Sequence, residues 1–141
     1  MSTAAEPTGA RKKTVLLVDD ESAIALLFEL ELTRMGYYVL KAHSGAEASK
    51  ISADFPTPID VLVTDWQMPD MSGDALACDL LVQRPQLKVI LMSGYTEAGD
   101  VAKAFSEDQL VFLSKPLSPA KLDETIRRLL RLPGKLDKQV A

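Results

Sequence analysis

Short apolar runs that alternate with amphipathic segments form the dominant pattern along the chain. Five runs rich in valine, leucine and isoleucine predict buried strands: Thr14–Val18, Tyr38–Ala42, Asp60–Asp65, Lys88–Ser93 and Leu110–Ser114. The segments between and after them have helical spacing of their apolar positions: Glu21–Gly36, Ser44–Ala53, about Asp74–Gln83, Glu97–Ser106 and Ser118 to about Leu132. Strands and helices that alternate in this way predict an α/β fold with a parallel, doubly wound sheet.

Residue types at the helix ends support these boundaries. Ser44 followed three residues later by Glu47 is a capping-box pattern. Gly36 provides a helix stop, and Ser118-Pro119 combines an N-cap with a first-turn proline.

The sequences of the first and last predicted helices each indicate side chains exposed on the surface. The core-facing stripe of the first helix is expected to contain five apolar residues: Ile24, Leu27, Phe28, Leu32 and Met35. Leu26 and Leu30 fall off this stripe, and Glu31 falls within it. The two leucines could dock a helical partner, although scattered surface leucines are the plainer explanation. The last helix is expected to expose three arginines: Arg127, Arg128 and Arg131.

Composition narrows the class of protein. The 141 residues suit one globular domain, expected at 14–132 between a disordered leader at 1–13 and a polar tail at 133–141. A net charge of −4 argues against direct nucleic-acid binding. The single cysteine, Cys78, excludes an internal disulfide, and it and the single histidine, His43, are interpreted as structural. Without an apolar segment long enough to span a membrane or a signal sequence, a cytoplasmic protein is expected.

Polar side chains gather where the predicted strands end. Asp19 and Asp20 follow the first strand, Asp65 ends the third, Ser93 ends the fourth and Lys115 follows the fifth. Taken singly, each has a plain explanation: Asp20 as a helix cap, Ser93 as a turn residue, Lys115 as a surface lysine. Because parallel strands place their carboxyl ends at one edge, all five residues are expected to meet there.

Such a cluster favours phosphoryl chemistry. Three close carboxylates raise one another's pKa or recruit a divalent cation, and their hard oxygen atoms suit Mg²⁺. Asp65, alone at its strand end, is the natural nucleophile. An acyl phosphate on Asp65 would need a metal on one side and Lys115 on the other to neutralise its charge, with Ser93 bonding a phosphoryl oxygen.

Four segments of the chain resemble the receiver domain of two-component response regulators, over about residues 13–132: VLLVDDE, VLVTDWQMPDMSG, LMSGY and VFLSKP. The resemblance implies a flavodoxin-like fold with five parallel strands in the order 2-1-3-4-5. It also implies that Asp65 is the phosphoacceptor. Asp19, Asp20 and the backbone carbonyl of Gln67 would hold Mg²⁺ with Asp65, and Lys115 would pair with the phosphoryl group.

The resemblance further implies a switch. Ser93 stands at the switch hydroxyl position, where threonine is commoner, and Phe112 stands at an aromatic position that many members fill with tyrosine. The bond between Lys115 and Pro116 is expected to be cis. Trp66, next to the phosphoacceptor, is interpreted as a half-exposed loop aromatic.

The function expected from this resemblance is a phosphorylation-activated signalling switch. A histidine kinase or a histidine phosphotransfer protein would donate the phosphoryl group, and a downstream effector protein would read the result, with a phosphorylation-dependent dimer as one possibility. The chain is expected to stand alone, because few residues follow Pro133. A relay intermediate, a phosphorylation-independent scaffold and a receiver excised from a hybrid kinase remain alternatives.

A metal-dependent phosphatase of haloacid-dehalogenase type is a further alternative from a different class. That chemistry also uses an aspartyl nucleophile and Mg²⁺ on an α/β sheet. It places the nucleophile after the first strand, with a second aspartate two residues later. Here Glu21 and Ser22 follow Asp20, which disfavours an enzyme of this kind.

Overall fold

A computed structural model describes residues 11–94 and 108–132, so the helix predicted at Glu97–Ser106 and the tail at 133–141 lie outside the described residues. The described strands follow the predicted ones closely: β1 (Thr14–Val18), β2 (Tyr38–Ala42), β3 (Val61–Asp65), β4 (Lys88–Ser93) and β5 (Leu110–Ser114). The described helices are α1 (Ser22–Arg34), α2 (Gly45–Asp54), α3 (Gly73–Gln83) and α5 (Pro119–Leu130).

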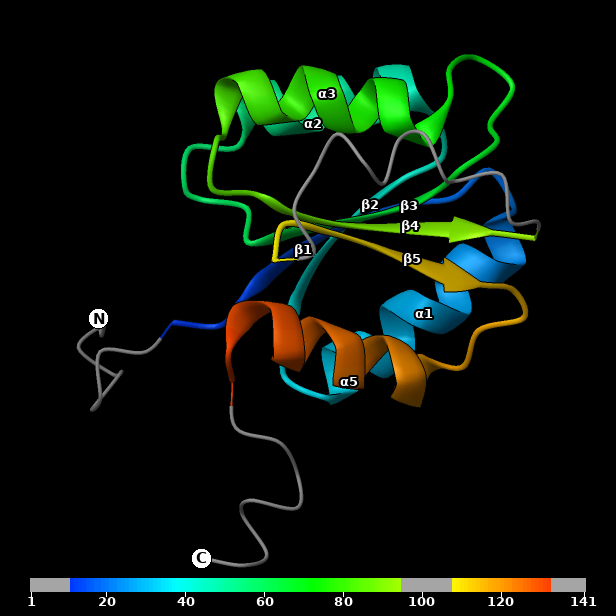
Figure 1. The fold of residues 1–141 in the computed structure, drawn as a ribbon, viewed down its shortest axis with the longest axis vertical. Helices are drawn as coiled ribbons and strands as arrows, with labels where there is room; N and C mark the ends of the chain where they lie inside the picture. The colour runs from blue at the N-terminus through cyan, green and yellow to red at the C-terminus, as the bar shows by residue number, and fades with distance from the viewer. Residues whose placement is uncertain (1–10, 95–107, 133–141) are drawn as a thin grey trace, which may run out of the picture.

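The five strands form one parallel sheet in the order β2-β1-β3-β4-β5, which confirms the predicted fold class. Helices α2 and α3 cover one face of this sheet, and α1 and α5 cover the other (Figure 1). Strands β1 and β3 are buried along their whole length, as their continuous apolar sequences require. The sheet therefore separates two apolar cores, one under each pair of helices.

Local sequence signals explain the helix ends. The Ser44 hydroxyl accepts a hydrogen bond from Glu47 N at 3.1 Å, as the capping-box pattern predicts. The Glu47 carboxylate accepts from His43 N rather than from Ser44 N, so the second half of the box is shifted by one residue. Gly36 has a φ of 106°, a left-handed conformation that glycine adopts without strain and that ends α1.

Three side chains on the helices differ from the sequence prediction. Leu27 is half exposed rather than part of the core, because Ala25, Phe28 and Leu32 already fill the inward stripe of α1. Glu31 pairs with Arg34 at the helix surface, since its long side chain reaches outward from the edge of that stripe. Arg127 is not a solvated arginine. Its guanidinium packs against α5 and binds the buried Asp123.

The beginning of the described chain is also held in place. The Arg11 guanidinium makes two hydrogen bonds of 3.0 Å to the Asp60 carboxylate, which also accepts from Thr14 N at 2.7 Å. Tyr38 N donates to Lys13 O, so the sheet ladder extends one residue before β1. Residues 11–13, predicted as the end of a disordered leader, therefore contact the folded domain.

Candidate phosphoacceptor site

The sheet itself fixes the predicted site residues. Asp19 N donates to Ala42 O at 3.1 Å, so the residue after β1 is still held by β2. In the same way Trp66 N binds Met92 O at 2.7 Å, and Lys115 N binds Ser93 O at 2.8 Å. The backbone ladder thus continues past the ends of the strands and presents their side chains at one edge.

Three carboxylates converge at this edge. One oxygen each from Asp19, Asp20 and Asp65 lies within 4.8 Å of the others. Asp19 is fully buried, Asp65 is 7% exposed and Asp20 is open to solvent. The Asp19 Oδ1 atom accepts a hydrogen bond from Glu21 N at 2.9 Å, whereas its buried Oδ2 has no hydrogen-bond partner. A buried carboxylate oxygen without a partner is costly, and a bound cation would remove that cost.

The electrostatics of Asp19 agree with a cation site. Burial raises the pKa of Asp19, and the charge of Asp65 raises it further, while the hydrogen bond from Glu21 N opposes the shift. A divalent cation among these oxygens would reverse both raising effects. Hard carboxylate oxygens with one exposed side suit Mg²⁺, which keeps part of its water shell. The donor set present here therefore fits that ion.

Lys115 supplies the positive charge on the other side of Asp65. Its Nζ lies 2.8 Å from Asp65 Oδ1. Burial alone would lower the pKa of Lys115. The hydrogen bond and charge of Asp65, with smaller effects of Asp19 and Glu21, outweigh burial and raise the pKa. Lys115 therefore remains an ammonium beside the candidate nucleophile, and the bond to Pro116 is cis, as the resemblance implies.

A small cavity of about 200 Å³ beside Asp65 brings in two further predicted site residues, Gln67 and Ser93. Its lining consists of Asp65, Trp66, Gln67, Ser93, Gly94 and Lys115. Among the described residues, no atom lies within 4 Å of a Cβ added at Gly94. Tyr95, which could cover the cavity, lies outside the described residues.

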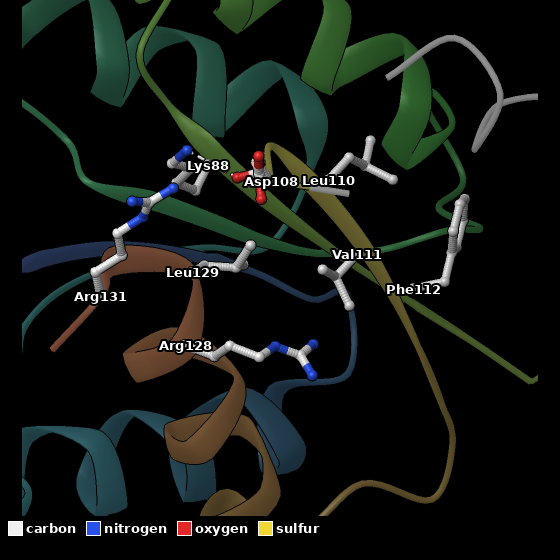
Figure 2. Close-up of a pocket in the computed structure, with 8 residues that line it drawn as sticks. All are labelled: Lys88, Asp108, Leu110, Val111, Phe112, Arg128, Leu129 and Arg131. Atoms are coloured by element: carbon white, nitrogen blue, oxygen red, sulfur yellow. Dashed lines mark hydrogen bonds between the residues drawn. The ribbon is translucent and has the colours of Figure 1, made fainter. Parts of the chain in front are cut away.

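Phe112 connects this cavity to a second hollow. Its ring packs against Trp66, with ring centroids 5.6 Å apart. Trp66 itself is partly exposed in the loop after β3, as expected. A groove of about 490 Å³ runs along β5 and α5. Figure 2 shows its lining residues, with Phe112 at one end and Lys88 and Arg131 at the other. Its lining residues are Lys88, Asp108, Leu110, Val111, Phe112, Arg128, Leu129 and Arg131.

An apolar hollow beside the carboxylates was not foreseen from the sequence. It has a volume of about 440 Å³ and is lined by Asp19, Ile24, Leu27, Phe28, Met92, Lys115, Pro116 and Leu117. The exposed leucines at positions 26, 27 and 30 lie on the same helix. The sequence of α1 contains more leucines than its core-facing stripe holds, and this excess indicates an apolar surface. Because Leu27 was assigned to the core, the hollow beside it was not predicted.

Comparison with known proteins identifies the family. The family model described as the response regulator receiver domain matches residues 15–127 of the chain. The chain belongs to this family. Its most similar relatives include the sensor kinase CckA of Brucella abortus, 36% identical over 117 residues that cover 83% of this chain and 12% of that protein. The chain spans about half or less of the curated relatives that it matches.

Solved structures agree with this assignment. A receiver domain protein from Clostridium thermocellum is 27% identical, with a TM-score of 0.74 over 92% of this chain and 99% of that one. The chemotaxis response regulator CheY4 of Vibrio cholerae is also 27% identical, with a TM-score of 0.73 over 84% of this chain and 99% of that one. Receiver domains are switches in two-component signalling that interact with histidine kinases and effectors, and this class agrees with the acidic cluster described above. Among the described helices, none is long and apolar enough to cross a membrane.

Proposed function

We propose that this receiver accepts a phosphoryl group on Asp65 from a phosphohistidine and passes the signal on by protein–protein contact. The observation that carries the proposal is the contrast on the two sides of Asp65. On one side Lys115 is already paired with the carboxylate at 2.8 Å, and on the other Asp19 keeps a buried oxygen without a partner. In this proposal the receiver unit spans residues 14–132.

The chemistry needs little beyond positioning and charge. An oxygen of the Asp65 carboxylate attacks phosphorus, an O–P bond forms, and the P–N bond to the donor imidazole breaks with its electron pair left on nitrogen. Lys115 Nζ, which already contacts Asp65 Oδ1, stays beside the new acyl phosphate and compensates its charge. The Ser93 hydroxyl lines the same cavity and would bond a phosphoryl oxygen.

Asp19, Asp20, Asp65 and the backbone carbonyl of Gln67 would hold Mg²⁺ in this proposal. The ion supplies charge neutralisation for the phosphoryl oxygens that gather over the acidic cluster. The chain contributes the hard oxygen donors, and the burial of Asp19 limits how many water molecules can compete for the site.

Phe112 would carry the signal away from the site. Its ring contacts Trp66, which follows the phosphoacceptor, and it also lines the groove along β5 and α5. Movement of Ser93 toward the phosphoryl group would let Phe112 move inward and change the shape of that groove. A downstream effector that binds the groove would then distinguish the two states.

The surface on α1 is the proposed docking site for the phosphohistidine donor. Leu26, Leu27 and Leu30 are 47%, 50% and 59% exposed, and the apolar hollow next to them includes both Asp19 and Lys115. A donor built as a helical bundle could place an apolar helix face on these leucines with its histidine over Asp65.

Intact-mass spectrometry tests the proposal. The protein is incubated with acetyl phosphate, or with a phosphorylated histidine phosphotransfer protein, in Mg²⁺ and in EDTA. The wild type should gain one phosphoryl mass only in Mg²⁺, and Asp65→Asn should gain none. No mass gain from either donor would favour the scaffold alternative. Steady hydrolysis of p-nitrophenyl phosphate by the wild type but not by Asp65→Asn would favour the phosphatase.

A further inference from the structure

The loop between β3 and α3, residues 66–72, is anchored at a point away from the acidic cluster. The Asp70 carboxylate accepts hydrogen bonds from two backbone amides at the start of α2. Gly45 N binds Oδ1 at 3.2 Å, and Ala46 N binds Oδ2 at 2.9 Å. These two bonds lower the pKa of Asp70 even though the side chain is exposed. The loop that follows the phosphoacceptor is therefore attached to a neighbouring helix by a carboxylate.

Packing reinforces this attachment. A Cβ atom at Gly45 would lie 2.3 Å from Met71 Cγ and 2.4 Å from Met71 Sδ. Met71 thus sits directly on the first residue of α2, in space that only glycine leaves free. The carboxylate and the thioether side chain hold the same end of the loop against the same helix.

The two ends of the loop are bonded to each other, and one of them is bonded to the sheet. Trp66 N binds Met92 O at 2.7 Å, and Gly73 N binds Trp66 O at 2.7 Å. A Cβ at Gly73 would come within 2.3 Å of the backbone oxygen of Asp65, so α3 starts directly against the phosphoacceptor. The segment between these ends contains Gln67, whose carbonyl is a proposed metal ligand, and Asp70 is the charged contact that this segment makes with α2.

The helix at the other end of this contact is coupled to the remaining metal ligands. Strand β2 pairs with β1 up to Ala42, and Ala42 O accepts the backbone amide of Asp19. Helix α2 begins three residues later, at Gly45. The start of α2 is therefore connected through a short segment to the backbone that positions Asp19, and Asp70 connects the Gln67 loop to that same point.

We propose that Asp70 is a positioning residue for the metal site, which sets the Gln67 loop relative to Asp19 and Asp20 by bonding to the first turn of α2. The inference rests on the proposed function, because it assumes that Mg²⁺ binds among these groups. Loss of the Asp70 contact would leave each ligand present but widen the range of positions that the Gln67 carbonyl occupies. Mg²⁺ affinity should then fall although no ligand has been removed.

Calorimetric titration with Mg²⁺ alone, in the full chain and without a phosphodonor, tests this inference. Asp70→Ala should raise the Mg²⁺ Kd by about tenfold, the low end of what outer-shell partners contribute. Asp70→Asn removes the same charge but keeps one acceptor oxygen, so its Kd should lie between wild type and Asp70→Ala. Asp79→Asn removes a charge from an exposed position on α3 and should leave the Kd unchanged.

Amide hydrogen exchange on the same variants reports the contact directly. The Gly45 and Ala46 amides should exchange faster in Asp70→Ala than in wild type and Asp79→Asn. Equal Kd values for wild type and Asp70→Ala would overturn the inference. So would equal weakening by Asp70→Ala and Asp70→Asn, which would indicate a charge effect only, or unchanged exchange at the two amides. A wild type that binds no Mg²⁺ would instead overturn the metal site of the proposed function, and this inference with it.

Discussion

Asp19 and Asp123 are both almost completely buried, and their surroundings are opposite. Asp123 on α5 is 3% exposed, and both of its oxygens are bonded. The Tyr37 hydroxyl donates to Oδ1 at 2.6 Å, and Arg127 Nε lies 3.1 Å from Oδ1 and 3.2 Å from Oδ2. Asp19 is 0% exposed, yet one of its oxygens has no hydrogen-bond partner and the nearest charged groups include other carboxylates.

This difference separates a structural carboxylate from a candidate metal ligand. Removing a charge from water is costly, and a fold recovers that cost only when the charge is paired and its oxygens are bonded. The Asp123 cluster meets both conditions and connects α5 to the residue before β2. Asp19 is neither fully paired nor hydrogen-bonded through both oxygens, and a cation would supply the missing positive charge and the missing contact. An incompletely satisfied buried charge at a strand end is therefore the clearest physical sign of the site.

The largest effect should come from breaking the satisfied cluster. Asp123→Asn removes the charge that Arg127 Nε and the Tyr37 hydroxyl contact, and it places an amide N–H₂ or a single oxygen between these two donors. We expect a loss of about 3–5 kcal/mol in the free energy of unfolding, the cost of breaking a buried ion pair. Urea unfolding followed by circular dichroism measures it. Asp79→Asn, at an exposed position, is the control, and equal stabilities of the two variants would contradict the structural role of Asp123.

A substitution that crowds the site should have the next largest effect. Gly73→Ala places a methyl group within 2.3 Å of the Asp65 carbonyl oxygen, so either the start of α3 or the Asp65 backbone must shift. A loss of about 1–3 kcal/mol is expected from overpacking, together with slower phosphorylation of Asp65. Val82→Ala, on the exposed face of α3, is the control, because it lies away from the site and should change neither quantity. Unchanged phosphorylation of Gly73→Ala would show that the site accepts a displaced backbone.

A smaller, pH-dependent effect is expected at Tyr37. Burial raises the pKa of the Tyr37 hydroxyl above its usual value of 10.0, and the hydrogen bond to Asp123 raises it further. Because the folded state holds this proton more tightly, the stabilisation is complete below pH 10 and decreases as pH rises above it. Tyr37→Phe should cost about 1–3 kcal/mol at pH 7, and its deficit relative to wild type should shrink above pH 10. A deficit that does not change with pH would contradict this assignment.

The α1 surface should show the smallest effect on stability. Leu30 is 59% exposed, so Leu30→Ser should change the free energy of unfolding by less than about 0.5 kcal/mol. The same variant should slow transfer from a histidine phosphotransfer protein while leaving phosphorylation by acetyl phosphate unchanged. Val82→Ser, on the exposed face of α3, is the control. Equal slowing with both donors would place the defect in the site rather than in docking.

Most of the fold was predictable because the buried strands have uninterrupted apolar sequences. Strand β4, for example, runs from Lys88 to Ser93 as predicted. The candidate site was predictable for a related reason, since a parallel sheet places Asp19, Asp65 and Lys115 at one edge whatever the side-chain details. Backbone topology alone, without any knowledge of packing, brought these residues together.

The features that the sequence did not predict all depend on contacts between distant segments. The sequence predicts a solvated Arg127 on α5, because it does not show that Asp123 is buried beside Tyr37. Tyr37 is 86 residues earlier in the chain. Leu27 reads as a core residue because helical spacing does not distinguish the edge of the apolar stripe from its centre. From the sequence Asp70 is only a loop aspartate, because its hydrogen bond to the start of α2 depends on how α2 packs next to the loop.

The most direct test of this account is the stability of Asp19→Asn with and without Mg²⁺, measured by urea unfolding beside wild type and Asp123→Asn. In EDTA, Asp19→Asn should be at least as stable as wild type, because it removes a buried charge that lacks full compensation. In Mg²⁺ at about 100 times the Kd, wild type should gain about 2.7 kcal/mol and Asp19→Asn almost nothing. A role of Asp19 as a cation ligand would be contradicted if Asp19→Asn lost as much stability in EDTA as Asp123→Asn and still gained the wild-type increment from Mg²⁺.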